Sequence, residues 1–270
     1  MAQTLVIHLG YRGAGFSGFA EQEGQRTIAG ELRRALETAL RRPVEFECAG
    51  RTDAGVHALA QYVSLPVADD ELPLVRGRLT RSLGALVPEE LSIRGLYLAP
   101  EGFSARFDAQ ARAYRYRIAC GEARPVMAWG HAWWLRPVTT LDVEAMDEAA
   151  RLLLGEHDFR SFCKTSSAEL LLQDGRSTSR FLAKCTVSRV NEAGEELVAI
   201  DVEGNAFLHN MVRIITGTLV EVGRGHRSPE WVEQVLLACD RKAAGPTAPP
   251  QGLTLCRVDY PGGVLVPARA

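Results

Sequence analysis

The feature that most constrains the fold is a series of strand-like and helix-like segments that occurs twice in the same order. Apolar residues that alternate with polar ones predict strands, and apolar residues at helical spacing predict helices. The first half contains, in order, a strand at 4–10, a helix at 28–40 with Thr27 as its N-cap, strands at 44–48 and 61–67, a helix at 74–86 and a strand at 91–98. The order β-α-β-β-α-β is that of the split ferredoxin-like fold.

The second half repeats this order. Its segments are a strand at 114–119, a helix at 143–153 stopped by Gly155, a hairpin of strands at 181–190 and 196–202, a helix at 207–222, a helix that starts at Ser228-Pro229, and a strand at 253–258. We therefore expect an α+β protein of two ferredoxin-like βαββαβ domains, residues 1–108 and 109–270. Their strands would merge into one mainly antiparallel sheet with a central cleft between the halves.

The composition is that of an ordinary globular protein, with 270 residues of which 46% are hydrophobic. No apolar stretch is long enough to span a bilayer, and the N-terminal residues do not form a secretory signal. The six cysteines form no C-x-x-C pair, which argues against structural zinc. Scattered thiols of this kind are typical of reduced core residues, so we expect a cytoplasmic protein without membrane association.

The net charge of −2 does not mark the chain as a nucleic-acid-binding protein, which is usually basic. All but three of its 31 basic residues are arginines. Arginine matches phosphates and base edges better than lysine does, but we attribute the total to compositional bias. Only local clusters of arginine therefore carry a functional argument.

The strongest candidate for chemistry is the segment 50–57, with the sequence Gly-Arg-Thr-Asp-Ala-Gly-Val-His. Its glycines flank a cation, a hydroxyl and a carboxylate, and glycine lets a ligand approach the backbone closely. Asp53 next to Arg51 would stay ionised, and an ionised carboxylate can act as a nucleophile or a base. The alternative is that Asp53 or Thr52 only satisfies the backbone of its own turn. The complete eight-residue string favours the catalytic interpretation.

A second candidate combines arginines with aromatic residues. Arginines reach phosphates, and aromatic rings stack on unpaired bases. The set comprises Phe103, Arg106, Phe107, Arg112, Tyr114, Arg115, Tyr116, Arg117 and Arg124. On a strand, Tyr114 and Tyr116 share one face while Arg115 and Arg117 share the other. We expect Tyr116 to be buried and Tyr114, at the start of the strand, to belong to the site.

A third candidate is the predicted helix 207–222. His209, Arg213 and Gly217 are spaced by four residues and share one helix face. That face is either solvated, or it directs Arg213 towards Asp53. The separation between His57 and His209 does not suggest a metal site, so we interpret both histidines as structural or RNA-facing.

These segments, in this order, closely resemble the TruA family of tRNA pseudouridine synthases over nearly the whole chain. The string at 50–57 is the most specific of them. The other matching stretches are 11–18, 103–107, 114–116, 154–159, 205–213 and 244–253.

The resemblance implies that Asp53 is the catalytic aspartate, that Tyr114 stacks on the target base and that Arg213 pairs with Asp53. It also implies that Arg51 helps to draw out the target nucleotide. With the aromatic cluster and the two histidines included, the candidate tRNA-binding residues are Arg51, His57, Phe103, Arg106, Phe107, Tyr114, Arg124, Arg176, Arg180 and His209.

The family converts uridine to pseudouridine at positions 38, 39 and 40 of the tRNA anticodon stem-loop. The resemblance therefore implies this activity for the chain, together with a homodimer and no cofactor or metal. A carboxylate can perform the reaction by trapping the sugar at C1′, by adding to the base, or by removing a sugar proton. The sequence leaves all three routes open.

The chain departs from the family pattern at several positions. Arg12 stands where the family usually has Asp, and Ala20-Glu21 replaces part of an aromatic-Gln-x-Gln sequence. The acidic run at 69–71 lies where a basic residue is common, and the segment 167–175 is longer than usual. These departures affect the expected RNA-binding surface rather than the catalytic centre.

Two other functions remain open at this point. A non-catalytic RNA-binding module would keep the arginines and aromatic residues but would have no need of Asp53. A glycosidic-bond hydrolase usually needs two placed carboxylates, and the strong motifs contain no second acidic residue.

Overall fold

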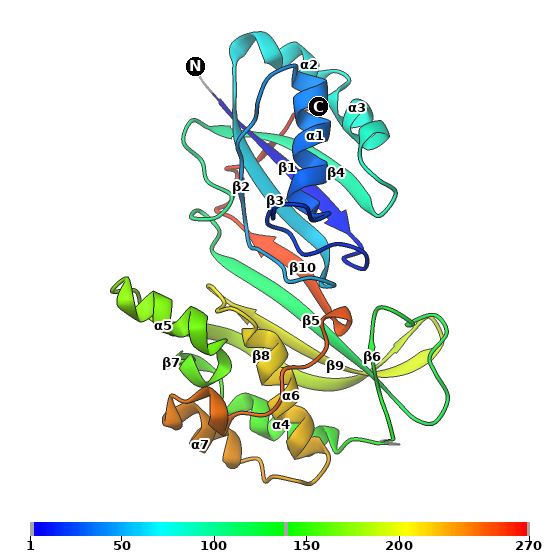
Figure 1. Ribbon diagram of the computed structural model, residues 1–270, viewed down its shortest axis with the longest axis vertical. Helices are drawn as coiled ribbons and strands as arrows, with labels where there is room; N and C mark the ends of the chain where they lie inside the picture. The colour runs from blue at the N-terminus through cyan, green and yellow to red at the C-terminus, as the bar shows by residue number, and fades with distance from the viewer. Residues whose placement is uncertain (1–2, 138–139, 269–270) are drawn as a thin grey trace. The chain divides into compact units, whose positions relative to one another are not determined.

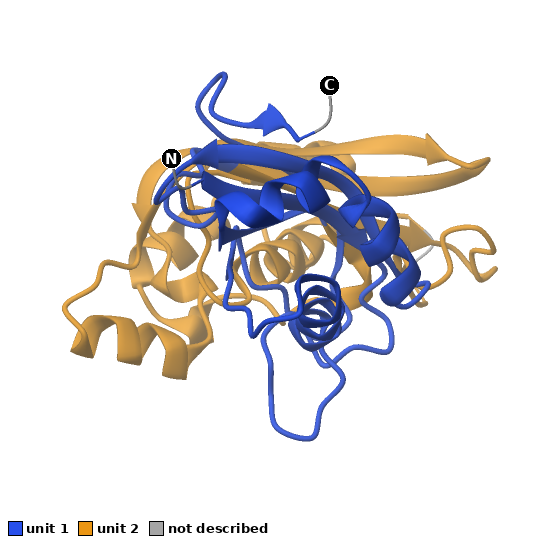
Figure 2. Ribbon diagram, turned by 90° about the horizontal axis from the view of Figure 1, so that it is seen from above, with its two compact units in different colours: residues 1–111, 255–270 blue, residues 112–254 orange. Residues whose placement is uncertain are grey.

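The computed structural model describes residues 3–137 and 140–268. The chain divides into two compact units (Figure 2): unit 1 comprises residues 1–111 and 255–270, and unit 2 comprises residues 112–254. The sequence had assigned residues 255–270 to the second domain. They belong to unit 1, where the strand that contains Leu255–Asp259 extends the sheet next to the strand His57–Val67.

Unit 1 is a mixed α+β unit built on a sheet (Figure 1). Its elements are β1 (Gln3–Tyr11), α1 (Ile28–Leu40), β2 (Glu47–Cys48), β3 (His57–Val67), a 3-10 turn (Asp69–Glu71), α2 (Leu72–Arg76), α3 (Leu79–Leu86), β4 (Leu91–Pro100), β10 (Leu253–Asp259) and β11 (Val266–Pro267). The sheet order is β11-β4-β1-β3-β10, and β2 also pairs with β3. The pairs β1–β3, β1–β4, β2–β3 and β4–β11 are antiparallel. The order β4-β1-β3-β2 gives the ferredoxin-like arrangement predicted from the sequence.

Helix α1 forms for the reasons that the sequence indicates. The Thr27 side chain accepts a hydrogen bond from the Gly30 amide at 3.2 Å, which satisfies one of the free N–H groups of the first turn. Ile28, Leu32 and Leu36 are buried on one face of the helix. Arg41 then takes a left-handed conformation and ends it.

Unit 2 repeats the pattern. Its elements are β5 (Ala111–Cys120), β6 (Trp133–Leu135), α4 (Val143–Arg151), β7 (Gly155–Asp158), α5 (Thr165–Gln173), β8 (Ser179–Glu192), β9 (Glu195–Gly204), α6 (Met211–Gly223), α7 (Trp231–Ala238) and 3-10 turns at Arg160–Phe162, Arg241–Ala243 and Pro250–Gly252. The sheet order is β5-β9-β8-β7, and all three of these pairs are antiparallel. The short strand β6 pairs with β5 in parallel. The predicted α+β class with mainly antiparallel sheets is confirmed.

Three predicted elements have different bounds in the structure. The segment 74–86 is two helices, α2 and α3, because the backbone leaves the helical conformation at Gly77. The predicted strand 44–48 is reduced to Glu47–Cys48. The last predicted helix begins at Trp231, after a turn in which the Trp231 amide donates to the Ser228 carbonyl.

Two further differences concern the neighbourhood of Arg213. The predicted helix 207–222 begins only at Met211, because Asn210 has a left-handed φ of 66° that no helix continues through. His209 therefore does not share a helix face with Arg213. The segment 167–175, which stood out in the sequence by its length, contains most of helix α5.

Helix α6 is buried almost all round and is packed against the loop 244–252, which we call the proline loop. A Cβ added at Gly217 would lie 1.8 Å from the Pro246 carbonyl oxygen. The glycine therefore lets the loop backbone lie directly on the helix. The Thr218 hydroxyl also accepts a hydrogen bond from the Gly245 amide at 3.0 Å. Within the described residues, no helix is both long enough and apolar enough to cross a membrane.

The close approach at Gly217 predicts opposite effects for two glycine-to-alanine substitutions in helices. Gly217→Ala must push the proline loop away from α6, so it should lower the free energy of unfolding by about 1–3 kcal/mol. A Cβ added at Gly84 in α3 has no atom within 4 Å. Gly84→Ala should therefore raise the free energy of unfolding by about 0.5–1 kcal/mol, because alanine loses less backbone entropy than glycine on folding. Urea denaturation of both variants measures the difference. Equal effects of the same sign would contradict the packing described at Gly217.

Candidate active site

The segment 50–57, which we call the catalytic loop, connects β2 to β3 and is held by buried polar groups of unit 1. The Thr52 hydroxyl shares a hydrogen bond of 2.8 Å with the Tyr11 hydroxyl at the end of β1. The Thr52 carbonyl accepts the Phe19 amide at 3.0 Å. Two residues earlier, the Gly50 carbonyl accepts a hydrogen bond of 2.6 Å from the Gln61 side chain. The loop is therefore fixed on its inner side.

A glycine makes the second attachment of the loop possible. The Gly13 amide donates to His57 Nδ1 at 3.1 Å, and a Cβ at Gly13 would lie 2.0 Å from the Val56 carbonyl oxygen. His57 is buried and its Nδ1 accepts a hydrogen bond from the backbone. This placement favours the structural interpretation of His57 over the RNA-facing one.

The side chains on either side of Thr52 are the ones that reach outwards. Arg51 is exposed and Asp53 is half-buried, whereas Thr52 is buried. The Asp53 carbonyl accepts the Val56 amide at 3.1 Å, which closes the turn. Burial raises the pKa of the nearby Cys48 thiol to about 11, against the opposing charges of Arg51 and Arg106. A protonated thiol is a poor nucleophile, so Cys48 is not suited to nucleophilic chemistry at this loop.

The second predicted cluster is divided between core and surface. Phe103 is buried against Val6 and Ala99. Phe107 is 71% exposed, with the Arg106 guanidinium 5.1 Å from its ring centre. Unit 1 therefore presents an arginine and an aromatic ring together on the loop after β4, while Phe103 supports that loop from below.

Strand β5 separates its two tyrosines as predicted. Tyr116 is fully buried, and its hydroxyl donates to the Pro249 carbonyl at 2.7 Å. Burial raises its pKa strongly. Tyr114 is half-buried, within β5 rather than at its start, and its ring meets Phe207 edge-on at 5.0 Å. A partly accessible ring braced by a second aromatic side chain is suited to stacking.

The two arginines that alternate with these tyrosines on β5 form ion pairs within the protein. Arg115 forms a two-point ion pair with Asp201, at 2.7 and 2.9 Å, and these hydrogen bonds raise its pKa. Arg117 pairs with Glu192 at 2.6 Å. The strand face that Arg115 and Arg117 share therefore carries ion pairs, and these two residues are not free to bind phosphate.

Arg213 lies in the first turn of α6 and is half-buried in unit 2. Its Nε donates to the Ala248 carbonyl at 2.8 Å, and one terminal nitrogen donates to the Asn210 side chain at 2.9 Å. The Ala248 amide donates back to the Arg213 carbonyl at 3.0 Å. The guanidinium is thus oriented by the proline loop and by the left-handed residue that starts the helix.

Arg176 and Arg180 form a separate basic group in unit 2. Arg180 is half-buried and donates to the carbonyls of Ser177 and Ser179, while its Nε is buried without a hydrogen-bond partner. Burial, and then the neighbouring charge of Arg176, lower its pKa. Neither arginine has a carboxylate partner within the described part of the chain.

Arg124 belongs to the loop 121–132, which we call the tryptophan loop. Its guanidinium lies 4.7 Å from the ring centre of Trp129, which is 55% exposed. Val126 and Met127 are also exposed. The Glu195 carboxylate accepts hydrogen bonds from the amides of Val126, Met127 and Ala128, and these bonds lower its pKa. The loop is therefore a fixed, apolar and basic surface, which the sequence had identified only through Arg124.

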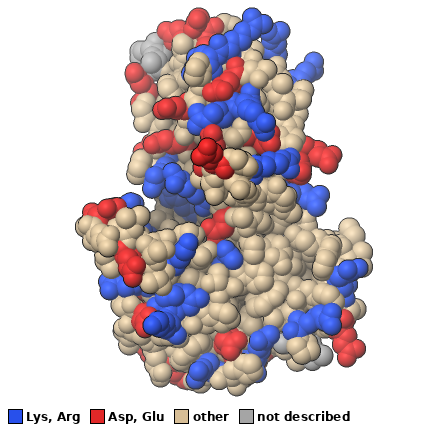
Figure 3. Space-filling model, in the orientation of Figure 1, with Lys and Arg blue, Asp and Glu red and all other residues tan. Residues whose placement is uncertain are grey.

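The remaining predicted residue and the departures have local roles. His209 is exposed, and its Nδ1 shares a hydrogen bond of 2.8 Å with Ser167 of α5. Glu21 forms an ion pair with Arg33 of α1 at 2.6 Å, which explains an acidic residue at this position. Arg12 is exposed and directly precedes Gly13, whose amide donates to His57 of the catalytic loop. On the face shown in Figure 3, basic and acidic side chains are interspersed.

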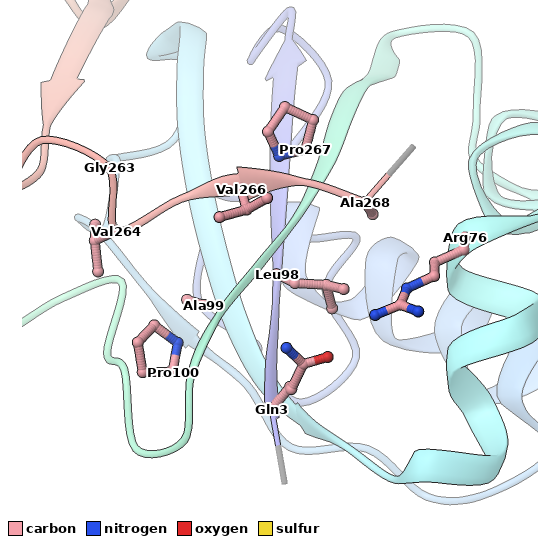
Figure 4. Close-up of a pocket in the computed structure, with 10 residues that line it drawn as sticks. All are labelled: Gln3, Arg76, Leu98, Ala99, Pro100, Gly263, Val264, Val266, Pro267 and Ala268. Carbon is pink, nitrogen blue, oxygen red and sulfur yellow. The ribbon is translucent and has the colours of Figure 1, made fainter. Parts of the chain in front are cut away.

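A hollow of about 860 Å³ in unit 1 is separate from the catalytic loop (Figure 4). It lies beside Gln3 and Leu98 and is covered by the C-terminal segment 263–268. Gln3 starts β1, whereas Tyr11 ends it. Arg76 is the one ionisable residue of its described lining, so the hollow offers no acid–base chemistry. Within the described residues, no group of His, Cys, Asp and Glu side chains is arranged to hold a metal ion.

The chain is similar to proteins of known family. A family model described as tRNA pseudouridine synthase matches residues 149–261. Curated proteins named tRNA pseudouridine synthase A match nearly the whole chain. The identity is 42% to that of Frankia casuarinae, over 98% of this chain and 92% of that protein. The identity to the protein of Brevibacillus brevis is 41%, over 93% of this chain and 97% of that protein. The identity to the protein of Geotalea uraniireducens is 40%, over 96% of this chain and 100% of that protein.

Among solved structures, a chain of a Cbf5-Nop10-Gar1 complex matches with a TM-score of 0.33 and 14% identity, over 94% of this chain and 48% of that chain. Similarity at this level carries no argument about the fold.

Proposed function

This chain belongs to the family of tRNA pseudouridine synthases, and we propose that Asp53 is the carboxylate that starts its reaction. The observation that carries this proposal is the catalytic loop. Hydrogen bonds to residues 50, 52 and 57 fix its inner side, while Asp53 is left partly accessible. A positioned carboxylate is what the isomerisation of uridine to pseudouridine needs, because the bond between N1 of the base and C1′ of the ribose must break, and the base must turn and be reattached to C1′ through C5.

We propose uridines 38, 39 and 40 of the anticodon stem-loop as the targets, by resemblance to the family. The target nucleotide must leave its stack, because a side chain cannot reach it inside a helix, and this costs a few kcal/mol. Stacking on Tyr114, which Phe207 braces, offsets part of that cost. Arg51 assists the extrusion. Arg213, oriented by the proline loop, pairs with the carboxylate of Asp53 and stabilises its charge. The reaction requires no cofactor.

The exposed basic and aromatic side chains are proposed to bind the tRNA backbone and unpaired bases. The exposed ones are Arg106, Phe107, Arg124, Arg176 and His209, and the half-buried Arg180 joins them. Phe103 and His57 are buried, so their part in binding is to support the loops that carry the exposed residues.

We also propose a cytoplasmic homodimer. All six cysteines, which lie in the described part of the chain, are free thiols, as a reducing compartment requires. The exposed Val126, Met127 and Trp129 of the tryptophan loop are an apolar surface of the kind that interfaces bury.

Asp53→Asn should lower the rate of pseudouridine formation on the order of a thousandfold or more, because the amide cannot act as nucleophile or base. The tRNA affinity should stay close to that of the wild-type protein. The measurement is mapping of pseudouridine in tRNA after incubation with pure protein and no added cofactor, together with a filter-binding assay. Asp70→Asn, which changes an exposed carboxylate of unit 1, serves as the control.

The outcomes of this experiment separate the three functions. Pseudouridine formed by Asp53→Asn at the wild-type rate would refute the catalytic role. Release of free uracil by the wild-type protein would indicate a glycosidic-bond hydrolase. Tight tRNA binding without any product, by wild-type protein and variant alike, would indicate an RNA-binding module.

Arg176→Ala should weaken tRNA binding and reduce the slope of log Kd against log salt concentration by about one, because one phosphate contact releases about one counterion. Arg180→Gln should act in the same direction. Arg151→Ala is the matched control, since Arg151 is an exposed arginine of unit 2 that pairs with Asp147. Unchanged slopes for Arg176→Ala and Arg180→Gln would exclude a phosphate contact at this group.

Trp129→Glu should shift the protein from dimer to monomer, because a carboxylate would be buried without a partner in the apolar contact. Sedimentation velocity at several concentrations gives the oligomeric state. Leu237→Glu is the control, because Leu237 is an apolar residue on α7 that is even more exposed than Trp129. A dimer that survives Trp129→Glu but not Leu237→Glu would place the interface on the other surface.

A further inference from the structure

A fully buried glutamine lies beneath the catalytic loop. The side chain of Gln61, on β3, has no exposed surface. Its Nε2 donates to the Gly50 carbonyl at 2.6 Å and to the Tyr11 hydroxyl at 3.3 Å, and its Oε1 accepts the Tyr62 amide at 3.2 Å. Burial of a primary amide is unfavourable unless its hydrogen bonds are satisfied. The satisfied amide therefore ties the start of the catalytic loop to the sheet.

Tyr11 extends this connection to the residue before Asp53. Its hydroxyl, which accepts from Gln61, also shares the 2.8 Å hydrogen bond with Thr52. Tyr11 and Thr52 are both buried, so this bond lies in a region of low dielectric constant, where hydrogen bonds are stronger than in water. The connection runs from Gln61 through Tyr11 to Thr52.

Thr52, where this connection ends, directly precedes Asp53 in the chain. Thr52 is held by its side chain through Tyr11 and by its carbonyl through Phe19. The backbone conformation at Thr52 sets the direction in which Asp53 leaves the loop. A shift of about 1 Å in a reacting group can lower a rate on the order of a hundredfold, so small changes at Thr52 reach the chemistry.

We propose that Tyr11 and Gln61 are positioning residues for Asp53, and that they act through Thr52 and Gly50. The inference rests on the proposed catalytic role of Asp53. None of these buried side chains is available to tRNA, so their loss acts on the chemical step rather than on substrate binding.

A double-mutant cycle between Tyr11 and Thr52 tests the proposal. Tyr11→Phe and Thr52→Val each remove one hydroxyl and keep the shape of the side chain. Each should lower kcat roughly tenfold and leave KM for tRNA within about twofold. The double variant should be no slower than the slower single variant, because both substitutions remove the same hydrogen bond. Thr52→Ser keeps the hydroxyl and should restore kcat.

Gln61→Met provides an independent variant, because it removes the hydrogen bonds to Gly50 and Tyr11 together. It should lower kcat by more than either single hydroxyl deletion. Thr27→Val is the matched control. It removes another buried threonine hydroxyl of unit 1, the N-cap of α1, and should lower the melting temperature while leaving kcat unchanged.

Wild-type kcat in Tyr11→Phe and Thr52→Val, with lowered melting temperatures, would overturn the proposal, because the network would then serve stability alone. Independent losses that multiply in the double variant would also overturn it. Asp53→Asn is measured alongside. If Asp53→Asn is inactive while both hydroxyl variants are fully active, only the positioning role fails. If Asp53→Asn is active, the proposed function itself fails.

Discussion

The hydrogen bond that Gln61 donates to the Gly50 carbonyl is the constraint that fixes the start of the loop carrying Asp53. A loop that presents a carboxylate outwards must leave several backbone groups pointing inwards, and buried backbone groups need partners. Side chains from β1 and β3 supply those partners, since Tyr11 and Gln61 stand at neighbouring positions on paired strands. The sheet therefore serves as a rigid support, and the loop needs no secondary structure of its own.

In unit 2, a helix and a loop together orient the Arg213 side chain. The proline loop lies so close to α6 that only glycine fits at residue 217. That approach brings the Ala248 carbonyl to the Arg213 side chain and the Pro249 carbonyl to the Tyr116 hydroxyl. A long, charged and entropically costly side chain is thereby held in one orientation before any substrate arrives, which is what electrostatic preorganisation requires. In both units, the groups proposed for chemistry are oriented by backbone carbonyls and buried side chains.

The sequence predicted these features unevenly, for physical reasons. Helix α1 was predicted to the residue because its N-cap and apolar periodicity act locally. The start of α6 was misplaced by four residues, because Asn210 adopts a left-handed conformation that tertiary packing imposes and propensity does not reveal. Asp53 was identified from its motif, but Gln61 was not, because a glutamine in a strand gives no signal until its neighbours across the sheet are known. Trp129 was missed for the same reason. Its exposure depends on hydrogen bonds between the tryptophan loop and Glu195, which is far from that loop in the sequence.

The arginines show how a chain of net charge −2 is suited to a polyanionic substrate. Arg115 and Arg117 have carboxylates directly across the sheet, so their charge is neutralised and their role is to join strands. Among the described residues, the partners of Arg180 are backbone carbonyls, and its buried Nε has no hydrogen-bond partner. Keeping such a cation half-buried is unfavourable in the free protein, as its lowered pKa shows. The phosphate contact proposed for this group would relieve that cost and add a charge-assisted hydrogen bond. The distribution of carboxylates, rather than the total charge, therefore determines which arginines are left for tRNA.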